Sequence, residues 1–217
     1  MKKIIFILAV LILFAGTVFA EVLQVVPDSP DITRNYLFYL HGRIVEGSDG
    51  RPVSSDYGPY EYYKILKAFS KEGFIVISEI RPENSDAESY SKKVGSCIIS
   101  LIKKGVPPKN ISVVGASKGG NITARVSSAL QQPDISYVIL AGLFAGSESE
   151  RGLKLSGRVL SVHDLSDRFP ISPEDYFSRS PGIQAKKIII TKTGLGHGLL
   201  YRPHKKWFFE ALLWIKQ

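Results

Sequence analysis

The segment 113–120 constrains the fold of this chain more than any other, because a short apolar run breaks there at a glycine, presents one serine and continues as a helix. Residues 111–114 are rich in β-branched side chains and too few to form a helix, so they predict a buried strand. Apolar residues then recur at helical spacing, at Ile122, Val126, Ala129 and Leu130. Ser117 therefore lies where a strand turns into a helix.

The sharp turn at Ser117 accounts for the two glycines that flank it. Gly115 and Gly119 stand where a Cβ atom would collide with the neighbouring strand or helix. The turn lifts the serine Oγ above the edge of the sheet, beside the first unpaired N–H groups of the helix, chiefly that of Lys118. This Gly-x-Ser-x-Gly pattern is typical of a nucleophile elbow. The alternative is a glycine-rich turn whose serine only caps the helix.

The first 20 residues have the order of a secretory signal peptide. Two lysines come first, residues 4–14 are apolar, and Val18 and Ala20 occupy the small-residue positions of a cleavage site. We expect cleavage after Ala20, and hence a secreted or periplasmic protein of residues 21–217 with no stable membrane insertion. The alternative is an uncleaved membrane anchor, since the apolar stretch nears the lower length limit for a span.

The length and composition of the rest of the chain suit one globular domain. Of the 217 residues, 197 follow the expected leader, enough for a single domain with a sizeable core. The one cysteine, Cys97, cannot close an intramolecular disulfide, and we expect it to be buried on the apolar face of a helix. The net charge of +8 becomes +6 when Lys2 and Lys3 leave with the leader. No basic stripe is interleaved with aromatic residues, so we expect no nucleic-acid partner.

Strands and helices alternate along the chain. We expect strands at residues 22–26, 36–40, 74–78, 111–114, 137–141, 158–162 and 187–191. Helices are expected around residues 62–73, at 86–104, from Ser117 onward, and from near Pro203. For Trp207 and Trp214 on this last helix we favour a place in the core over one in an interface. The 16 residues 142–157 are typical of a loop. The alternation predicts an α/β fold, a mostly parallel central sheet flanked by helices on both faces, with its chemistry at the carboxyl ends of the strands.

Two more motifs follow the last two expected strands. Asp167 stands in His163-Asp164-Leu165-Ser166-Asp167, and His197 stands in Gly194-Leu195-Gly196-His197-Gly198. Over essentially all of residues 21–217, the chain resembles a small member of the α/β-hydrolase superfamily without a large cap domain. The motifs of that superfamily come in the order nucleophile, acid, base. The resemblance implies a catalytic triad of Ser117, Asp167 and His197.

Each member of this triad has a chemical role. An imidazole takes the proton of the serine hydroxyl and later protonates the leaving group, while a carboxylate fixes the imidazole tautomer. Asp164 is the alternative acid, because it lies three residues before Asp167 in the same loop. We favour Asp167, since the superfamily places the acid a few residues beyond the strand. His204 is the rival base, but it falls in the expected first turn of the last helix, where it caps the helix or faces solvent.

The pair His41-Gly42 resembles the loop after the third strand that donates the second oxyanion N–H in this superfamily. The backbone of Arg43 is the candidate donor, and its side chain either faces solvent or meets an acidic group of the substrate. His41 precedes the serine, whereas the base of the superfamily follows it, so we interpret His41 as a structural hydrogen-bonding residue. The chain lacks the His-Gly-Gly-Gly form of many lipases and esterases.

These motifs predict a secreted serine hydrolase that works through an acyl-enzyme on a small-molecule or acylated substrate, with carboxylic esters as the expected class. The alternatives are a thioesterase, peptidase or acyltransferase on the same fold, or a non-catalytic binding protein. Because residues 142–157 hold only a short loop, we expect an open site, with Leu143, Phe144 and Leu199 either lining an acyl pocket or packing in the core. No metal-binding or cofactor-binding motif is present, so we expect neither metal nor cofactor.

Overall fold

The computed structural model describes residues 21–144, 152–170 and 172–217. Its centre is a seven-stranded sheet in the order β1-β5-β2-β6-β7-β8-β9, in which every neighbouring pair is parallel. The strands are β1 (Glu21–Leu23), β2 (Tyr36–Leu40), β5 (Ile75–Ile77), β6 (Ile111–Ala116), β7 (Ser136–Leu140), β8 (Ser156–Asp164) and β9 (Gly182–Thr191). A separate antiparallel ribbon pairs β3 (Val53–Ser54) with β4 (Gly58–Pro59). The predicted parallel sheet is confirmed.

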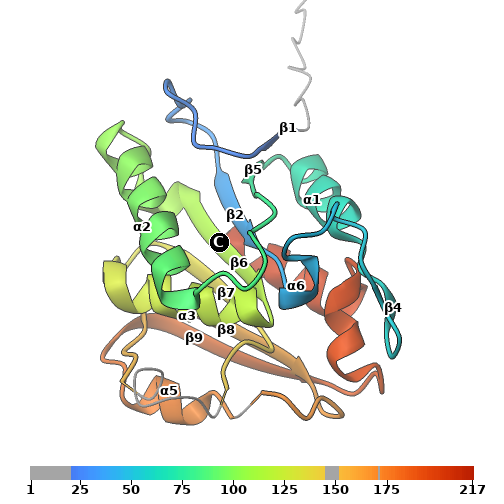
Figure 1. Ribbon diagram of the computed structural model, residues 1–217. Coiled ribbons are helices and arrows are strands. Elements are labelled where there is room, and N and C mark those ends of the chain that lie inside the picture. Colours follow the sequence, from blue (N-terminus) through green and yellow to red (C-terminus); the bar gives the residue numbers. More distant parts are fainter. Residues whose placement is uncertain (1–20, 145–151, 171) are drawn as a thin grey trace, which may run out of the picture.

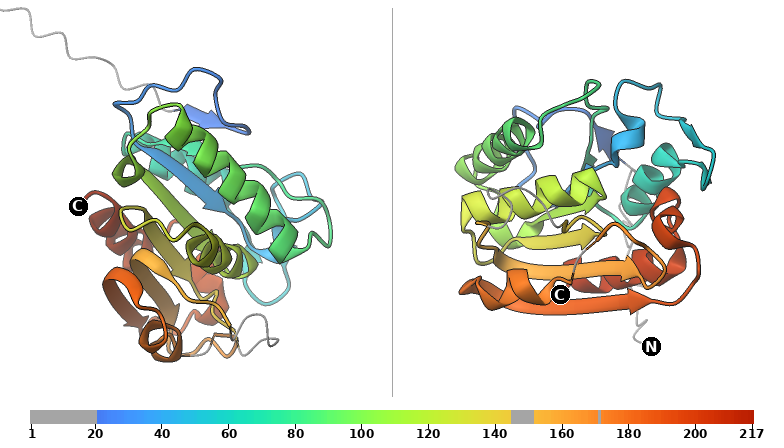
Figure 2. Two further views of the ribbon diagram at one scale, coloured as in Figure 1. Left: turned by 90° about the vertical axis from the view of Figure 1, so that its left-hand side faces the viewer. Right: turned by 60° about the horizontal axis from the view of Figure 1, so that its bottom comes forward.

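Helices cover both faces of this sheet, as predicted (Figures 1 and 2). On one face lie α1 (Tyr62–Lys71) and α6 (Lys205–Ile215). On the other lie α2 (Ala87–Lys103), α3 (Lys118–Leu130) and the short α5 (Glu174–Ser178). The short 3-10 helices are η1 (Arg43–Val45), η2 (Pro108–Asn110) and η3 (Gly196–Tyr201).

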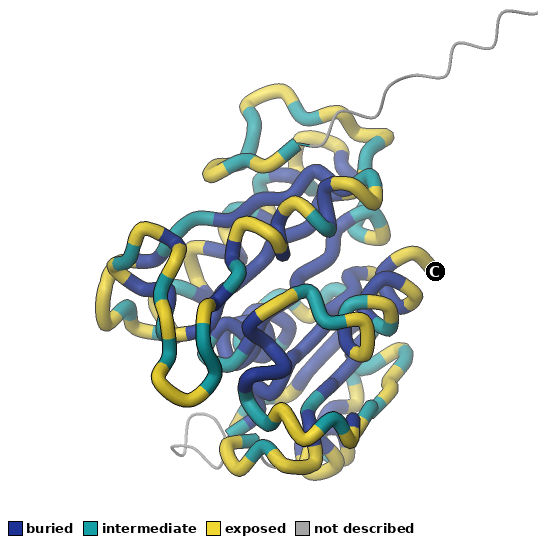
Figure 3. Tube along the Cα trace, turned by 90° about the vertical axis from the view of Figure 1, so that its right-hand side faces the viewer, coloured by how far each residue is buried: buried dark blue, intermediate teal, exposed yellow. Residues whose placement is uncertain are grey.

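The apolar side chains form one core on each face of the sheet, because alternate residues of a strand point to opposite sides. In β2, Leu37 and Tyr39 belong to the core beneath α1 and α6, whereas Phe38 and Leu40 belong to the core beneath α2 and α3. All of β2 is buried, as expected for a strand with helices above and below it. Figure 3 shows the central strands as a buried layer with exposed loops around it.

The two edges of the sheet differ from the prediction. β1 ends at Leu23 rather than at Val26, because the strand beside it, β5, ends at Ile77 opposite Leu23. At the other edge, β8 extends over Ser156–Asp164 and β9 begins five residues earlier than expected, at Gly182. Exposed polar residues such as Gln184 and Lys186 occupy this edge strand, so it lacks the apolar run by which a strand is recognised.

Smaller differences concern the last helix and Cys97. α6 begins at Lys205, and His204 is its N-cap, accepting a hydrogen bond at Nδ1 from the backbone N–H of Lys206 at 3.3 Å. Cys97 is half-buried against the core rather than fully buried. Trp207 and Trp214 are buried in the core, as predicted. Within the described ranges, no helix is long and apolar enough to cross a membrane.

The parallel strands bring the predicted site residues to one edge of the sheet. η1 follows β2, Ser117 follows β6, Asp167 follows β8, and His197 follows β9 in η3. Because these four strands run in the same direction, their carboxyl ends share an edge, which is where sheets of this type carry their ligands.

Candidate active site

Ser117 occupies the turn between β6 and α3 with φ 54° and ψ −119°. A non-glycine residue keeps such sparsely populated angles only where its surroundings hold it there, against a strain of about 1–3 kcal/mol. The Ser117 N–H donates to the carbonyl oxygen of Leu140 at 2.8 Å, and the Ser117 carbonyl accepts from the N–H of Asn121 at 3.0 Å as α3 begins. β7 and α3 thus hold the serine in this turn.

The glycines on either side of Ser117 are required by close packing, as predicted. A Cβ atom on Gly115 would lie 2.1 Å from the carbonyl oxygen of Gly119, and one on Gly119 would lie 1.8 Å from the carbonyl oxygen of Leu40. Both distances are far below van der Waals contact. The turn can therefore approach α3 and the end of β2 this closely only with glycine at both positions.

Asp167 and His197 meet although they come from different loops. Asp167 Oδ2 lies 2.7 Å from His197 Nδ1. The carboxylate side chain is 1% exposed and the imidazole 12%. A carboxylate at Nδ1 keeps the proton on that nitrogen and leaves Nε2 to accept another, which is the tautomer that a general base needs.

Asp164, the alternative acid, is occupied by other hydrogen bonds. Its Oδ1 accepts from the hydroxyl of Ser166 at 2.6 Å, and its Oδ2 accepts from the hydroxyls of Thr191 and Thr193, both at 2.7 Å. Burial raises the pKa of Asp164, but these hydrogen bonds outweigh burial and hold its pKa well below the usual range for aspartate. The carboxylate thus joins the ends of β8 and β9, and the geometry favours Asp167 as the partner of the imidazole.

Ser117 and His197 line one cavity of about 250 Å³ at the carboxyl edge of the sheet. The other lining residues are mainly apolar or aromatic: Gly42, Arg43, Ile44, Tyr57, Tyr60, Ala116, Phe144, Phe169, Leu200 and Tyr201. The His197 ring contacts Phe169 edge-on, with 5.0 Å between ring centroids. No hydrogen bond between described residues joins Ser117 Oγ to His197 Nε2, a contact that commonly tightens only when substrate is bound.

Arg43 and Lys118, the predicted oxyanion donors, are the first residues of η1 and α3. Backbone N–H groups at a helix start have no partner within their own helix. The two helix starts lie close together, because a Cβ atom on Gly42 would lie 3.7 Å from Ser117 Cβ. This is the arrangement that a two-donor oxyanion hole beside the serine requires.

His41 is fully buried and lies outside the cavity lining, in agreement with a structural role. Its Nε2 accepts a hydrogen bond from the Arg81 backbone N–H at 3.0 Å. The proton of the ring is therefore on Nδ1, which lies 2.8 Å from the carbonyl oxygen of Gly42. Burial, together with the nearby Arg81 cation, lowers the pKa of His41 to about 3.

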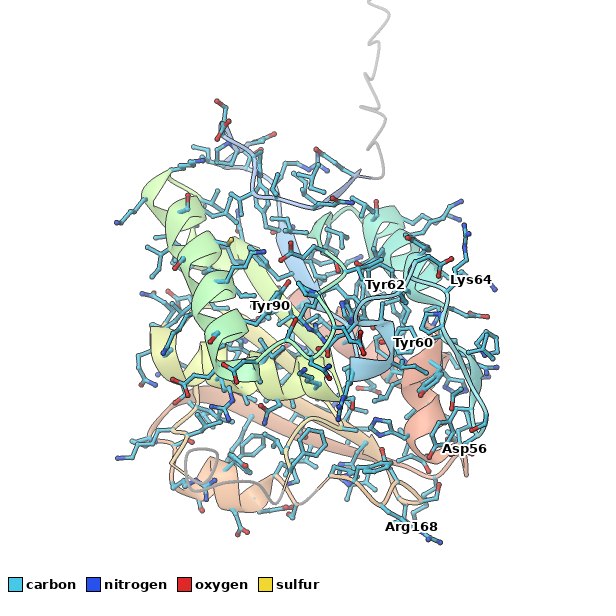
Figure 4. All side chains as sticks on the ribbon, viewed as in Figure 1. Asp56, Tyr60, Tyr62, Lys64, Tyr90 and Arg168 are labelled. Carbon is cyan, nitrogen blue, oxygen red and sulfur yellow. The ribbon has the colours of Figure 1, made fainter. Side chains whose placement is uncertain are left out.

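The structure decides between the two alternatives for the candidate pocket residues. Phe144 lines the cavity, whereas Leu143 and Leu199 are buried in the two cores on opposite faces of the sheet. Most of the lining was not predicted, including Tyr57, Tyr60, Phe169 and Tyr201. Figure 4 labels Tyr60, together with the exposed Arg168 at the lower surface. The one sequence signal for these residues is two tyrosines in the turn-rich segment 57–60, which is also compatible with an ordinary surface loop.

Comparison with solved structures found several proteins with a similar fold. A dienelactone hydrolase, so named, from Klebsiella pneumoniae aligns with a TM-score of 0.62 and 13% identity over 88% of this chain and 89% of its own. Arabidopsis thaliana SOBER1 aligns with a TM-score of 0.57 and 17% identity over 84% of this chain and 98% of its own. A lipase-esterase related protein from Clostridium acetobutylicum gives a TM-score of 0.57 and 15% identity over 85% and 96%. The chain has an α/β-hydrolase fold.

The likeness to these α/β-hydrolases is one of fold, since all three identities lie below 20%. Comparison of the sequence with protein-family models and with curated proteins found no match. Within the α/β-hydrolase fold described here, residues 21–144, 152–170 and 172–217 contain no group of three His, Cys, Asp or Glu side chains that could hold a metal ion.

Proposed function

We propose that this α/β-hydrolase is a secreted serine hydrolase that cleaves carboxylic esters through an acyl-enzyme. The observation that carries the proposal is the 2.7 Å contact between Asp167 Oδ2 and His197 Nδ1 beside a cavity that both His197 and Ser117 line. Ser117 and His197 come from separate loops and line the same cavity, and Asp167, from a third loop, contacts His197. Such a grouping of nucleophile, base and acid supports acyl transfer.

The proposed reaction proceeds in two halves. Ser117 Oγ attacks the ester carbonyl carbon while His197 Nε2 takes its proton, and the backbone N–H groups of Arg43 and Lys118 bind the oxyanion of the tetrahedral intermediate. The imidazolium then protonates the departing alcohol, and the acyl group stays on Ser117. In the second half, His197 takes a proton from water, which attacks the acyl carbon; the bond from that carbon to Ser117 Oγ then breaks, the imidazolium returns its proton to Oγ, and the acid leaves. Asp167 holds the imidazole in one tautomer and stabilises its charged form.

The cavity bounds the size and polarity of the acyl group. About 250 Å³ with walls of tyrosine, phenylalanine and leucine accommodates a short aliphatic chain or a single ring. Burying apolar substrate surface there contributes roughly 25 cal/mol per Å² to binding. We therefore propose small apolar acyl esters, or one acyl group that is exposed on a larger molecule.

Removal of the nucleophile tests this proposal. With p-nitrophenyl butyrate as substrate, we expect Ser117→Ala to lower kcat by roughly 10⁴-fold or more, as in other serine triads. A fluorophosphonate probe should label Ser117 in the wild-type protein and leave the variant unlabelled. Substantial activity in the variant, or an unlabelled wild type, would show that the proposal is wrong.

Parallel assays distinguish ester hydrolysis from the alternative activities and from binding without catalysis. Matched acyl thioesters and aminoacyl anilides distinguish a thioesterase or a peptidase, and an added alcohol acceptor reveals acyl transfer. A protein that is inert toward every one of these substrates, yet gains thermal stability from an apolar ester, would be a binding protein.

A further inference from the structure

Behind the candidate oxyanion site lies a cluster of three charged side chains from three segments. Arg81 Nε donates to Glu46 Oε1 at 3.1 Å, and Lys118 Nζ lies 2.7 Å from the same oxygen and 2.9 Å from Oε2. The side chain of Arg81 is fully buried, that of Glu46 is 2% exposed, and that of Lys118 is 20% exposed. Two cations thus share one carboxylate in a nearly dry environment.

Arg81 holds both ends of the segment 41–46, which carries the Arg43 N–H. At the first end, Arg81 Nη2 donates to the carbonyl oxygen of His41 at 2.6 Å, and the Arg81 backbone N–H donates to His41 Nε2. At the other end, Arg81 Nε binds the carboxylate of Glu46, the C-cap residue of η1. One guanidinium therefore fixes η1 to the segment that follows β5.

The Glu46 carboxylate extends this connection to the elbow. Lys118 is the first residue of α3 and directly follows Ser117, so its ion pair with Glu46 joins the start of α3 to the end of η1. The side chains of Arg81, Glu46 and Lys118 thus connect the backbone at Arg43 to the backbone at Lys118. None of these three residues lines the cavity.

Two aromatic rings close the cluster from opposite helical layers. Tyr62 of α1 meets the His41 ring edge-on at 5.6 Å between centroids, and the Arg81 guanidinium lies 5.4 Å from the centroid of the Tyr90 ring of α2. Figure 4 labels both tyrosines. With its surroundings packed in this way, the cluster has little freedom to rearrange when charge develops nearby.

We propose that Glu46 and Arg81 are positioning residues which, with the Lys118 side chain, set the distance between the two oxyanion N–H groups. The inference rests on the proposed hydrolase function. Buried ion pairs contribute little net stability compared with apolar packing, so a gain in stability does not account for this one. A two-donor oxyanion hole, in contrast, needs its donors placed to within about 0.5 Å, and a misplacement of about 1 Å can lower the rate roughly 10²-fold.

The sharpest test is Lys118→Met. This variant keeps the backbone N–H and the Glu46–Arg81 pair, and it removes only the link between η1 and α3. We expect kcat for p-nitrophenyl butyrate to fall by about 10-fold or more while KM changes less than threefold, because the donors bind the oxyanion and not the ground state. Affinity for phenylboronic acid, whose adduct with Ser117 carries an oxygen in the oxyanion position, should fall by the same factor as kcat/KM.

Matched variants separate positioning from general damage. Lys92→Met removes another lysine–glutamate pair, with Nζ 2.9 Å from the Glu88 carboxylate, at an exposed site on α2, and it should leave kcat and boronate affinity unchanged. Lys118→Arg restores a cation and should restore most of kcat. Should Lys118→Met fail to fold, Glu46→Gln serves as the second variant with the same expected split between kcat and KM.

The outcomes distinguish the inference from the proposed function. A kcat of Lys118→Met within twofold of wild type, or a loss of kcat with unchanged boronate affinity, overturns the positioning role. Ser117→Ala is assayed beside it. If Ser117→Ala keeps its activity, the hydrolase proposal itself is wrong; if it is inactive while Lys118→Met is fully active, only the positioning role is wrong.

Discussion

Two aspartates three residues apart in the loop after β8 have different surroundings and therefore different expected roles. Asp167 places one oxygen against an imidazole at the cavity, whereas Asp164 accepts hydrogen bonds from both neighbouring strand ends. Both residues are aspartates in the same short segment, so the sequence alone does not show which of them contacts the imidazole. In the structure they differ in their hydrogen bonds: hydroxyl groups of Ser166, Thr191 and Thr193 and two backbone N–H groups donate to Asp164, whereas Asp167 contacts the His197 imidazole.

This difference predicts opposite phenotypes for two conservative substitutions. Asp167→Asn should lower kcat by roughly 10⁴-fold with little change in stability, because the amide favours the wrong imidazole tautomer. Asp164→Asn should lower the free energy of unfolding by about 1–3 kcal/mol while the folded variant keeps kcat within a few-fold of wild type. Steady-state kinetics and urea unfolding measure the two effects. An inactive but stable Asp164→Asn would reverse the assignment of the acid.

His41 predicts a pH dependence of stability. Its pKa is about 3 in the folded protein and near 6.5 when unfolded, so between these values the unfolded chain binds a proton that the folded chain does not. Stability from this residue is complete above about pH 6.5 and falls as the pH decreases toward 3, by about 1.4 kcal/mol for each pH unit. In an NMR titration, the His41 ring signals should keep their neutral positions down to pH 4. A midpoint near 6.5 would contradict the buried, neutral ring.

At the scale of elements, the elbow depends on how closely α3 approaches β2. Gly119→Ala would place a Cβ atom 1.8 Å from the Leu40 carbonyl oxygen. Because this oxygen belongs to the backbone of a buried strand, relieving the clash would require β2 or α3 to shift. We expect this variant to lose more than about 3 kcal/mol of stability or to fail to fold. Thermal and urea unfolding monitored by circular dichroism measure the loss.

Gly95→Ala in α2 is the matched control for Gly119→Ala. Its Cβ atom would lie 3.6 Å from the nearest atom, Leu130 Cδ2, which is ordinary contact. Because alanine is the better helix former, we expect a gain of up to about 1 kcal/mol. Equal effects of the two substitutions would mean that the close approach of α3 to β2 is not a requirement of the fold.

The interior strands could be predicted from the sequence because every one of their residues is buried, so each strand is a run of mostly apolar residues. β2, β6 and β7 are buried on both faces and appear as continuous apolar runs. β9 could be predicted only over its second half, since Gln184 and Lys186 face solvent at the edge of the sheet. The ionic cluster of Glu46, Arg81 and Lys118 gives no signal, because a charged residue in a loop is normally exposed and these three are far apart in the sequence.

At the scale of the whole molecule, the cavity is a product of topology. Its wall is formed by η1, the segment 57–60, the elbow, the loop after β8 and η3. Because the strands are parallel, the loops that follow them lie at the same edge of the sheet. That Ser117, Asp167 and His197 lie at this edge could be predicted, because each follows a recognisable strand and the order and context of the motifs carry information. The aromatic wall could not, since tyrosines and phenylalanines in loops have no spacing that indicates a shared cavity.

The pairing of β1 at the edge of the sheet leads to a last prediction. Glu21, Val22 and Leu23 pair with Ile75, Val76 and Ile77 at one edge of the sheet, so a chain that starts at Glu21 keeps all of this pairing. If residues 1–20 are a cleaved leader, protein recovered from outside the cytoplasm should begin at Glu21, and a recombinant chain 21–217 should match it in unfolding temperature and esterase activity. Intact mass spectrometry decides the first point. A recovered mass of 24.0 kDa, that of residues 1–217, would show that the first 20 residues are retained and would favour an uncleaved anchor.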